Sequence, residues 1–192
     1  METSYPGPLR HEPLAVELHN TLYAVAREPF DGLETVDGLK AWLMGIRDRL
    51  PEAARDADPS RRAAFLDLRA AVRDALHAVV DGAPVPRDAL EMLNAAAAAA
   101  PASVRAVVDN RGRLRAEPDY HEADTTEIAL AAMAADAIEL ITGPAAEQLR
   151  ACEAPGCVLM FAKDHPRRTW CSAACGNRAR QARHYEQTRD AR

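Results

Sequence analysis

Apolar residues recur at helical spacing along much of this chain, which predicts a mainly helical body. The clearest helix begins at Ser60 and ends at Asp81-Gly82, a pair typical of a helix C-terminus. Its apolar stripe consists of Phe65, Leu68, Val72, Leu76 and Val79. The opposite face carries Arg62, Arg69 and Arg73 among acidic residues, and we interpret this run as a solvated surface rather than a nucleic-acid groove.

Other segments carry shorter helical patterns. Residues 13–27 first alternate like a strand and then follow helical spacing, and we favour a helix, followed by a turn over residues 29–32. Thr35 is the expected cap of one helix, and Asp124 with Glu127 predicts a capping box at the start of another. Further helices are therefore expected over residues 35–43, 87–100, 124–143 and 145–150.

The pattern changes to that of a β-hairpin between two of these helices. Residues 104–108 are rich in valine, Asp109 to Gly112 is a turn signal, and residues 113–117 alternate like a returning strand. The predicted fold class of residues 1–148 is therefore mainly α with a small β-hairpin near residues 103–117, an α+β arrangement. A length of 192 residues suits one such domain and a second, smaller one.

All four cysteines lie near the C-terminus, in two close pairs that predict a metal site. Cys152 and Cys157 enclose Pro155-Gly156, as in a knuckle turn, and Cys171 and Cys175 are spaced so that one helical turn can present both. A short apolar strand over residues 158–161 lies between the pairs. A knuckle, a hairpin and then a ligand-bearing helix is a treble-clef plan, so we predict that the four cysteines bind Zn²⁺.

Two alternatives to this zinc site use the same region. Two disulfides would need the same four cysteines, but Met1 to Arg10 is polar, without the apolar stretch of a signal peptide, so we expect a reducing, cytoplasmic location. His165 or His184 could replace one ligand, although a complete cysteine set makes this the weaker alternative. Four cysteine ligands leave no open position on zinc, and the chain shows no phosphate loop or nucleophile elbow, so we do not expect an enzyme.

Charge is distributed unevenly along the chain. The net charge of the whole chain is −5. From Cys152 onward there are eight Lys and Arg and four Asp and Glu, so this part carries +4 and the remainder carries −9. An acidic body with a basic end favours a nucleic-acid-facing C-terminus. Nothing in the sequence is apolar over the roughly 18 residues needed to span a membrane.

The stretch Trp170-Cys-Ser-Ala-Ala-Cys-Gly-Asn-Arg178, followed by a basic helix, resembles the CGNR zinc-finger family. Leu18-His-Asn-Thr-Leu22 resembles a short Asn-Thr motif near the start of that family's proteins. The chain differs from the family pattern at Arg180, where lysine is common, and at Thr169, which separates the arginines from Trp170.

This resemblance implies an N-terminal ABATE domain joined to a C-terminal treble-clef-like finger, in a stress-related transcription regulator. We accordingly expect an ABATE-like domain over residues 1–148 and a CGNR zinc finger with a basic C-terminal helix over residues 149–192. The expected partners are DNA, a small-molecule effector and a second copy in a homodimer, the last because one finger of this size binds DNA weakly. The composition leaves a second function class open, that of a protein-interaction module in which the finger is a scaffold.

Helical geometry divides the side chains of the last helix between two faces. With Ser172 as its N-cap, Arg178 falls on the side of Cys171 and Cys175, so we expect it to support the zinc site, with Asn177 between the faces. Four other arginines are predicted to contact DNA phosphates. They are Arg180 and Arg183 on the helix and Arg167 and Arg168 on the preceding turn.

Asn20 and Thr21 are polar residues within an otherwise apolar segment. Their functional interpretation is contact with a ligand in the N-terminal domain. The alternative is a structural hydrogen bond to the backbone, because buried polar groups need partners in any case.

Overall fold

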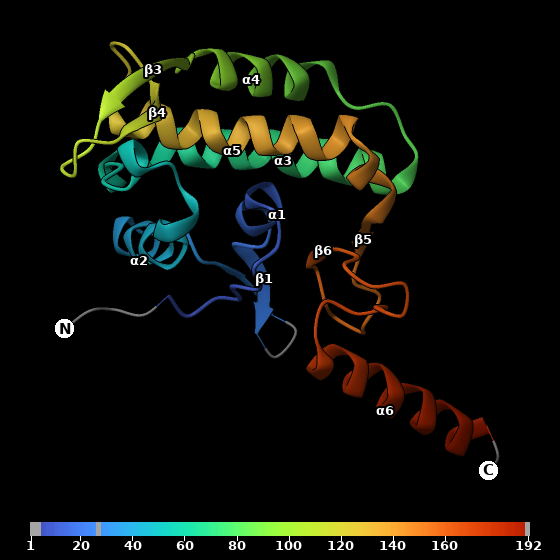
Figure 1. The fold of residues 1–192 in the computed structure, drawn as a ribbon. Coiled ribbons are helices and arrows are strands. Elements are labelled where there is room, and N and C mark those ends of the chain that lie inside the picture. The colour runs from blue at the N-terminus through green and yellow to red at the C-terminus, as the bar shows by residue number, and fades with distance from the viewer. Residues whose placement is uncertain (1–4, 26–27, 191–192) are drawn as a thin grey trace.

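The computed structural model describes residues 5–25 and 28–190 (Figure 1). Helices α3 (Arg62–Asp81) and α5 (Thr125–Thr142) pack against each other at its centre, and α4 (Arg87–Ala98) packs on both. The short helix α1 (Leu14–His19) contacts α3 and α5, and α2 (Val36–Ile46) contributes Leu39, Trp42 and Ile46 to the same core. The 3-10 turns η1 to η3 lie over Arg47–Arg49, Glu52–Ala54 and Pro59–Arg61.

Local sequence signals explain where these helices begin and end. The side chain of Thr35 accepts a hydrogen bond from the N–H of Gly38, and Asp124 with Glu127 forms the predicted capping box of α5. Helix α3 ends at Gly82, whose φ of 64° is left-handed and suits glycine. The mainly helical fold class is therefore confirmed.

The helix predicted over residues 13–27 is wrong over residues 20–25, and residues 26 and 27 lie outside the described part of the chain. Helix α1 ends at His19, and β1 (Leu22–Val25) pairs antiparallel with β2 (Glu28–Asp31), where the sequence predicted a turn. All six residues of α1 are buried, so no polar face marks its period. A two-stranded ribbon accommodates Pro29 because proline is tolerated on edge strands.

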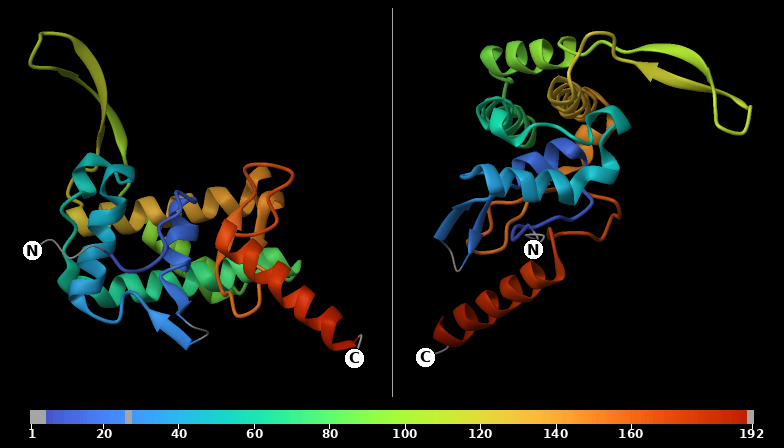
Figure 2. Two further views of the ribbon diagram at one scale, coloured as in Figure 1. Left: turned by 90° about the horizontal axis from the view of Figure 1, so that it is seen from below. Right: turned by 90° about the vertical axis from the view of Figure 1, so that its left-hand side faces the viewer.

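The predicted hairpin is present as β3 (Ser103–Val108) and β4 (Leu114–Asp119), which pair antiparallel. It projects from the helical body as an arm, shown from two directions in Figure 2. Neither strand pairs with any other strand of the described chain.

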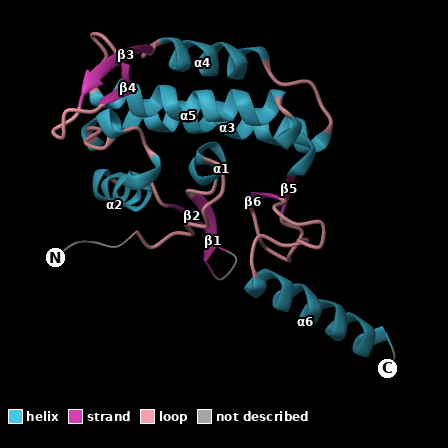
Figure 3. Cartoon of the chain, in the orientation of Figure 1, coloured by secondary structure: helices cyan, strands magenta, loops and turns pink. Residues whose placement is uncertain are grey.

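The C-terminal part begins with η4 (Pro144–Gln148), a 3-10 turn where a short helix was expected. Strands β5 (Leu149–Ala151) and β6 (Met160–Ala162) then form an antiparallel pair, and α6 (Ala173–Asp190) extends away from the body (Figure 3). No helix within residues 5–25 and 28–190 is long and apolar enough to cross a membrane.

Two hydrophobic clusters hold the protein together. The larger fills the helical body and includes Leu149 and Met160 from the C-terminal strands. The smaller surrounds the cysteines and includes Tyr23 from β1. Body and finger thus contribute side chains to each other's cores, and the predicted boundary between residues 148 and 149 stays a prediction.

Candidate metal centre

The four cysteine sulfurs converge on one point. All four Sγ atoms lie within 4.8 Å of one another. The Sγ of Cys175 is 3.4 Å from that of Cys171 and 3.8 Å from that of Cys157, and the Cys157 and Cys171 sulfurs are also 3.8 Å apart. A tetrahedral ion with Zn–S bonds of about 2.3 Å separates its ligands by about 3.8 Å, so the sulfurs fit around one zinc ion.

Backbone turns place the first pair of sulfurs. The N–H of Cys152 bonds to the carbonyl of Leu159, and the N–H of Cys157 bonds to that of Ala154, each at 2.9 Å. Gly156 has a φ of 71°, which lets the chain turn back so tightly between the two ligands. This geometry is a zinc knuckle between β5 and β6.

The second pair is positioned by the start of α6. The N–H of Cys171 points at the Sγ of Cys152 at 3.5 Å, and the Oγ of Ser172 accepts a hydrogen bond from the N–H of Cys175 at 3.2 Å. Ser172 therefore caps the helix as predicted. A Cβ at Gly176 would lie 2.9 Å from the Trp170 ring, so glycine in the CGNR motif lets that ring pack against the helix.

The crowded sulfurs cannot all ionise unless a cation lies between them. Hydrogen bonds from Cys157 and Cys171 lower the pKa of the Cys152 thiol, and the same contact raises the pKa of Cys157 to about 11. Zinc resolves this conflict because coordinated thiols lose their protons. All four cysteines are free at the separations given above, which is against the disulfide alternative.

Family comparison places this geometry among known proteins. The model described as ABATE, "Putative stress-induced transcription regulator", matches residues 12–144, which is more than half of the chain. The chain belongs to the ABATE family. A second model, the CGNR zinc finger, matches residues 148–188 and assigns the four-cysteine cluster to a zinc finger with Zn²⁺ as its metal. No curated protein matches the chain.

Asn20 joins the ABATE domain to the zinc finger. Its side-chain amide donates to the carbonyl of Met160 at 3.0 Å, and its Oδ1 accepts from the N–H of Met160 at 2.9 Å. Asn20 is fully buried. The structural alternative of the sequence analysis therefore accounts for Asn20 better than a ligand contact, because both groups of the carboxamide already have partners.

The hydroxyl of Thr21 is also engaged in hydrogen bonds within the protein. Its hydroxyl donates to the carbonyl of Leu18 at 2.7 Å and accepts from Arg69 at 3.1 Å. Arg69 is itself buried and pairs with Asp31, so the sequence interpretation of Arg69 as solvated is wrong. Burial opposes ionisation of Asp31, but the hydrogen bonds from Arg69 outweigh it and lower the pKa of the carboxyl.

Arg168 contacts the protein itself. Its guanidinium forms an ion pair with the buried carboxylate of Glu12, donates to the carbonyl of Ala162 at 3.0 Å and lies 4.7 Å from the ring centroid of Phe161. The N–H of Ala162 in turn donates to Glu12 at 2.9 Å. These contacts correct the prediction that Arg168 contacts phosphate, since its donors are engaged within the protein. Sequence reasoning missed Glu12, which carries no local motif.

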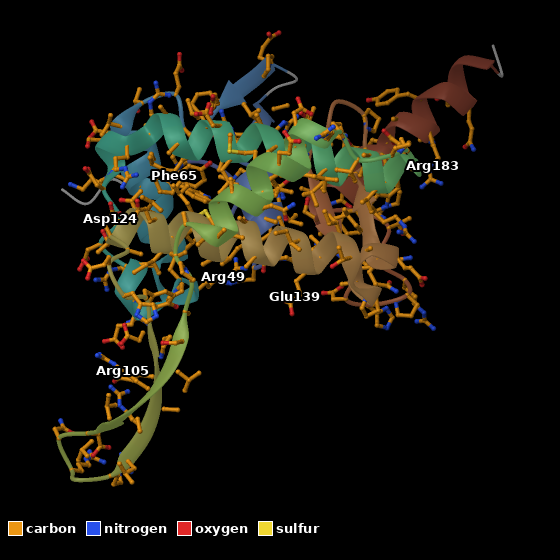
Figure 4. The ribbon with its side chains drawn as sticks, turned by 90° about the horizontal axis from the view of Figure 1, so that it is seen from above. Arg49, Phe65, Arg105, Asp124, Glu139 and Arg183 are labelled. Atoms are coloured by element: carbon orange, nitrogen blue, oxygen red, sulfur yellow. The ribbon has the colours of Figure 1, made fainter. Side chains whose placement is uncertain are left out.

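The remaining predicted positions lie around the finger. The Nη2 of Arg178 is 3.3 Å from the Sγ of Cys175, the contact expected of a residue that supports the zinc site, and Asn177 accepts a hydrogen bond from Arg180. Arg167, Arg180 and Arg183 are exposed, and Figure 4 shows Arg183 reaching out from α6. The roles of these residues stay predictions.

A cavity of about 400 Å³ lies between the two parts of the protein. The N-terminal segment and β1 form one side, and the knuckle and the first turns of α6 form the other. Arg10 and Arg178 bring two guanidinium groups to an otherwise mainly apolar lining, beside Tyr23.

Proposed function

We propose that this ABATE protein is a DNA-binding transcription regulator whose zinc finger holds the basic helix α6 against the phosphate backbone. The observation that carries the proposal is the exposure of Arg180 and Arg183 on a helix that leaves the body. The local charge of +4 from Cys152 onward favours the same assignment because the body, at −9, repels phosphate. The two family descriptions, of a regulator and of a zinc finger, support it.

Three arginines form the proposed phosphate contacts. Arg167, Arg180 and Arg183 are exposed and can each give bidentate hydrogen bonds to phosphate. Three contacts correspond to a slope of log affinity against log salt of about −2.7, at ~0.9 per phosphate. A single finger with so few contacts binds weakly, so we include in the proposal a homodimer that places two fingers on neighbouring half-sites.

The test is a salt titration of a double variant. Arg180→Ala/Arg183→Ala should bind a mixed-sequence DNA duplex more weakly, with a slope shallower by about 1.8. The control, Arg47→Ala/Arg87→Ala, removes two partly or fully exposed body arginines and should leave both quantities unchanged. Equal affinities and slopes in all three proteins would reject DNA binding by α6. The better account would then be a zinc-scaffolded protein–protein interaction module.

We place the effector of the proposed regulator in the cavity between the ABATE domain and the finger. The two arginines favour a small molecule that carries an anionic group. A ligand held there would contact β1 and α6 together and so could alter how the helix is presented. Arg10→Ala should weaken this binding, measured by the thermal shift that candidate carboxylates and phosphates produce. The proposal also places the protein in the cytoplasm, where thiols stay reduced and free to bind zinc.

A further inference from the structure

The register of the β3–β4 hairpin sorts its side chains into two faces of opposite character. One face, called here the apolar face, consists of Val104, Ala106, Val108, Leu114, Ala116 and Pro118. The other, the charged face, consists of Ser103, Arg105, Val107, Arg115, Glu117 and Asp119. Two-faced strands are usual where the apolar side covers a core, so the position of this apolar face decides its meaning.

The apolar face is open to solvent in the described chain. Val104, Val108 and Leu114 are 80%, 64% and 78% exposed, and the other three members are exposed too. The charged face is already paired, because Arg105 lies 3.7 Å from Glu117 and 3.8 Å from Asp119. The surface that needs a partner is therefore the apolar one.

The hairpin projects beyond the helices, as the left view of Figure 2 shows, and Figure 4 marks Arg105 on it. An isolated two-stranded hairpin is marginally stable in water, and three or more strands or a packed face are needed for independent stability. An exposed apolar patch on a projecting ribbon is accordingly typical of an interaction surface.

The two ends of the hairpin carry opposite charge. The tip, residues 109–115, has three arginines and one aspartate, a balance of +2. The base, residues 101–105 and 119–124, has one arginine and three acidic residues, and Arg61 pairs with Asp124 there, which leaves a balance of −1. Arg111 at the tip and Glu122 at the base form no ion pair within residues 5–25 and 28–190.

We propose that the apolar face binds the same face of a second copy of this chain, with the two hairpins stacked antiparallel about a two-fold axis. This arrangement lays each positive tip over the partner's negative base, so one surface supplies both halves of the complementarity. Counting along the strands, an axis at the Ala106–Ala116 pair brings position 111 opposite positions 121 and 122 of the other copy.

The sizes of the side chains fit this crossing point. The pair at the centre consists of two alanines, which allow close approach, and the pairs on either side carry Val108 with Leu114 and Val104 with Pro118. A cavity of about 480 Å³ beside the base, lined in part by Tyr120, Ala123 and Ile128, lies where the partner's tip would reach. The same acidic base disfavours nucleic acid as the occupant, because phosphates would meet like charge.

The expected dimer is weak and reversible. Each face is about 20 Å long and two strands wide, so the paired hairpins alone bury less than the roughly 1,200 Å² of a standard interface. The tip-to-base contacts enlarge it. The role of the dimer in pairing two fingers rests on the proposed function. The existence of the dimer does not, so the test of dimerisation uses no DNA.

The first test changes the apolar face. The full-length, zinc-loaded protein should dimerise in sedimentation equilibrium, and Leu114→Asp should be monomeric at the same concentrations. The control is Val36→Asp, which places the same carboxylate at an exposed valine in the first turn of α2, where it suits the helix dipole. It should dimerise like the wild type. Matching circular dichroism spectra would show that each variant is folded. A monomeric wild type, or Leu114→Asp that dimerises normally, would overturn the proposal.

The second test examines the antiparallel orientation. Arg111→Glu and Glu122→Arg should each raise the dimer Kd about tenfold, because each disturbs two symmetry-related ion pairs. The double variant Arg111→Glu/Glu122→Arg should recover most of the wild-type Kd, since the pairs are restored with reversed sign. Additive losses in the double variant would contradict this stacking. A monomer that keeps the salt-dependent DNA binding described above would overturn the dimer here and in the proposed function, and would leave the phosphate contacts of α6 standing.

Discussion

The carboxamide of Asn20 makes both of the backbone hydrogen bonds to Met160 that a neighbouring β-strand would make. The two residues are separated by 140 positions in the sequence. One belongs to the ABATE domain and the other to β6, beside the zinc knuckle. This buried side chain is therefore one of the contacts, together with the Glu12–Arg168 ion pair, that hold the zinc finger on the helical body.

Replacing this amide should loosen the finger. Asn20→Asp keeps the size of the side chain, but it removes the donor to the Met160 carbonyl and buries a carboxylate there. We expect a loss of about 3 kcal/mol in the free energy of unfolding. The control Asn94→Asp changes an exposed asparagine of α4 and should cost less than about 0.5 kcal/mol. Urea unfolding measures both, and equal losses would contradict the docking role.

His19 should make the protein less stable in acid. Because the Oδ1 of Asn20 only accepts, the ring proton of His19 lies on Nδ1, and Nε2 faces Arg73 and His77. Burial, together with the charge of Arg73, lowers the pKa of His19 to about 3 from an ordinary value of 6.5. The unfolded chain therefore binds an extra proton between these values. The contribution of neutral His19 to the free energy of unfolding is complete above pH 6.5. It falls as the pH approaches 3, by up to about 1.4 kcal/mol per pH unit.

The variant His19→Gln isolates this contribution. Its stability should fall less steeply than that of the wild type between pH 6.5 and 4, whatever its loss at neutral pH. His121→Gln, which changes an exposed histidine, should follow the wild-type curve. Parallel curves for the wild type and His19→Gln, measured by urea unfolding at several pH values, would reject the assignment.

Zinc removal should unfold the finger before the body. The segment around the cysteines has only a small core, so the metal supplies much of its stability. Metal analysis should find one zinc per chain, and Cys171→Ser should lose it together with the helical signal of α6, while the body keeps its helices. Ser172→Ala removes only the cap, at a cost of about 1 kcal/mol, and should retain zinc. Zinc-free protein with an intact α6 would contradict this prediction.

Arg178 and Arg180 lie on the same helix, but replacing each by alanine should affect zinc affinity differently. The guanidinium of Arg178 contacts the thiolate cluster, so Arg178→Ala should lower zinc affinity about fivefold, close to 1 kcal/mol for an exposed charge-assisted contact. Arg180→Ala should leave that affinity unchanged, because its side chain contacts Asn177. Competition with a chromophoric chelator measures both variants. Equal affinities would assign Arg178 to another role.

Features encoded within one or two helical turns could be predicted from the sequence. Thr35, the Asp124 capping box and Gly82 mark helix ends through contacts three or four residues away, and the structure has each of them. The zinc ligands could be predicted from the sequence in the same way, because each cysteine pair is formed by one local turn.

Polar contacts between distant residues could not be predicted in the same way. Arg69 pairs with Asp31 across 38 positions and Arg168 with Glu12 across 156, so neighbouring acids in the sequence gave no sign of either partner. Both arginines were therefore expected at the surface. The strands β1 and β2 were missed for a related reason, since Asp31 is held by Arg69 and Tyr23 packs in the cluster around the cysteines, and local spacing shows neither contact.

Among the described side chains, those that bury helix α6 against the protein lie near its start. Beyond Ala179, none of its described side chains is buried, although the helix continues to Asp190. Its 18 residues are about 27 Å long, so a tilt of 10° at the zinc site displaces the far end by about 5 Å, more than one base-pair step of ~3.4 Å. The helix therefore pivots as a rigid rod about the zinc site. Small changes at Asn20 or Glu12 would be magnified at its free end.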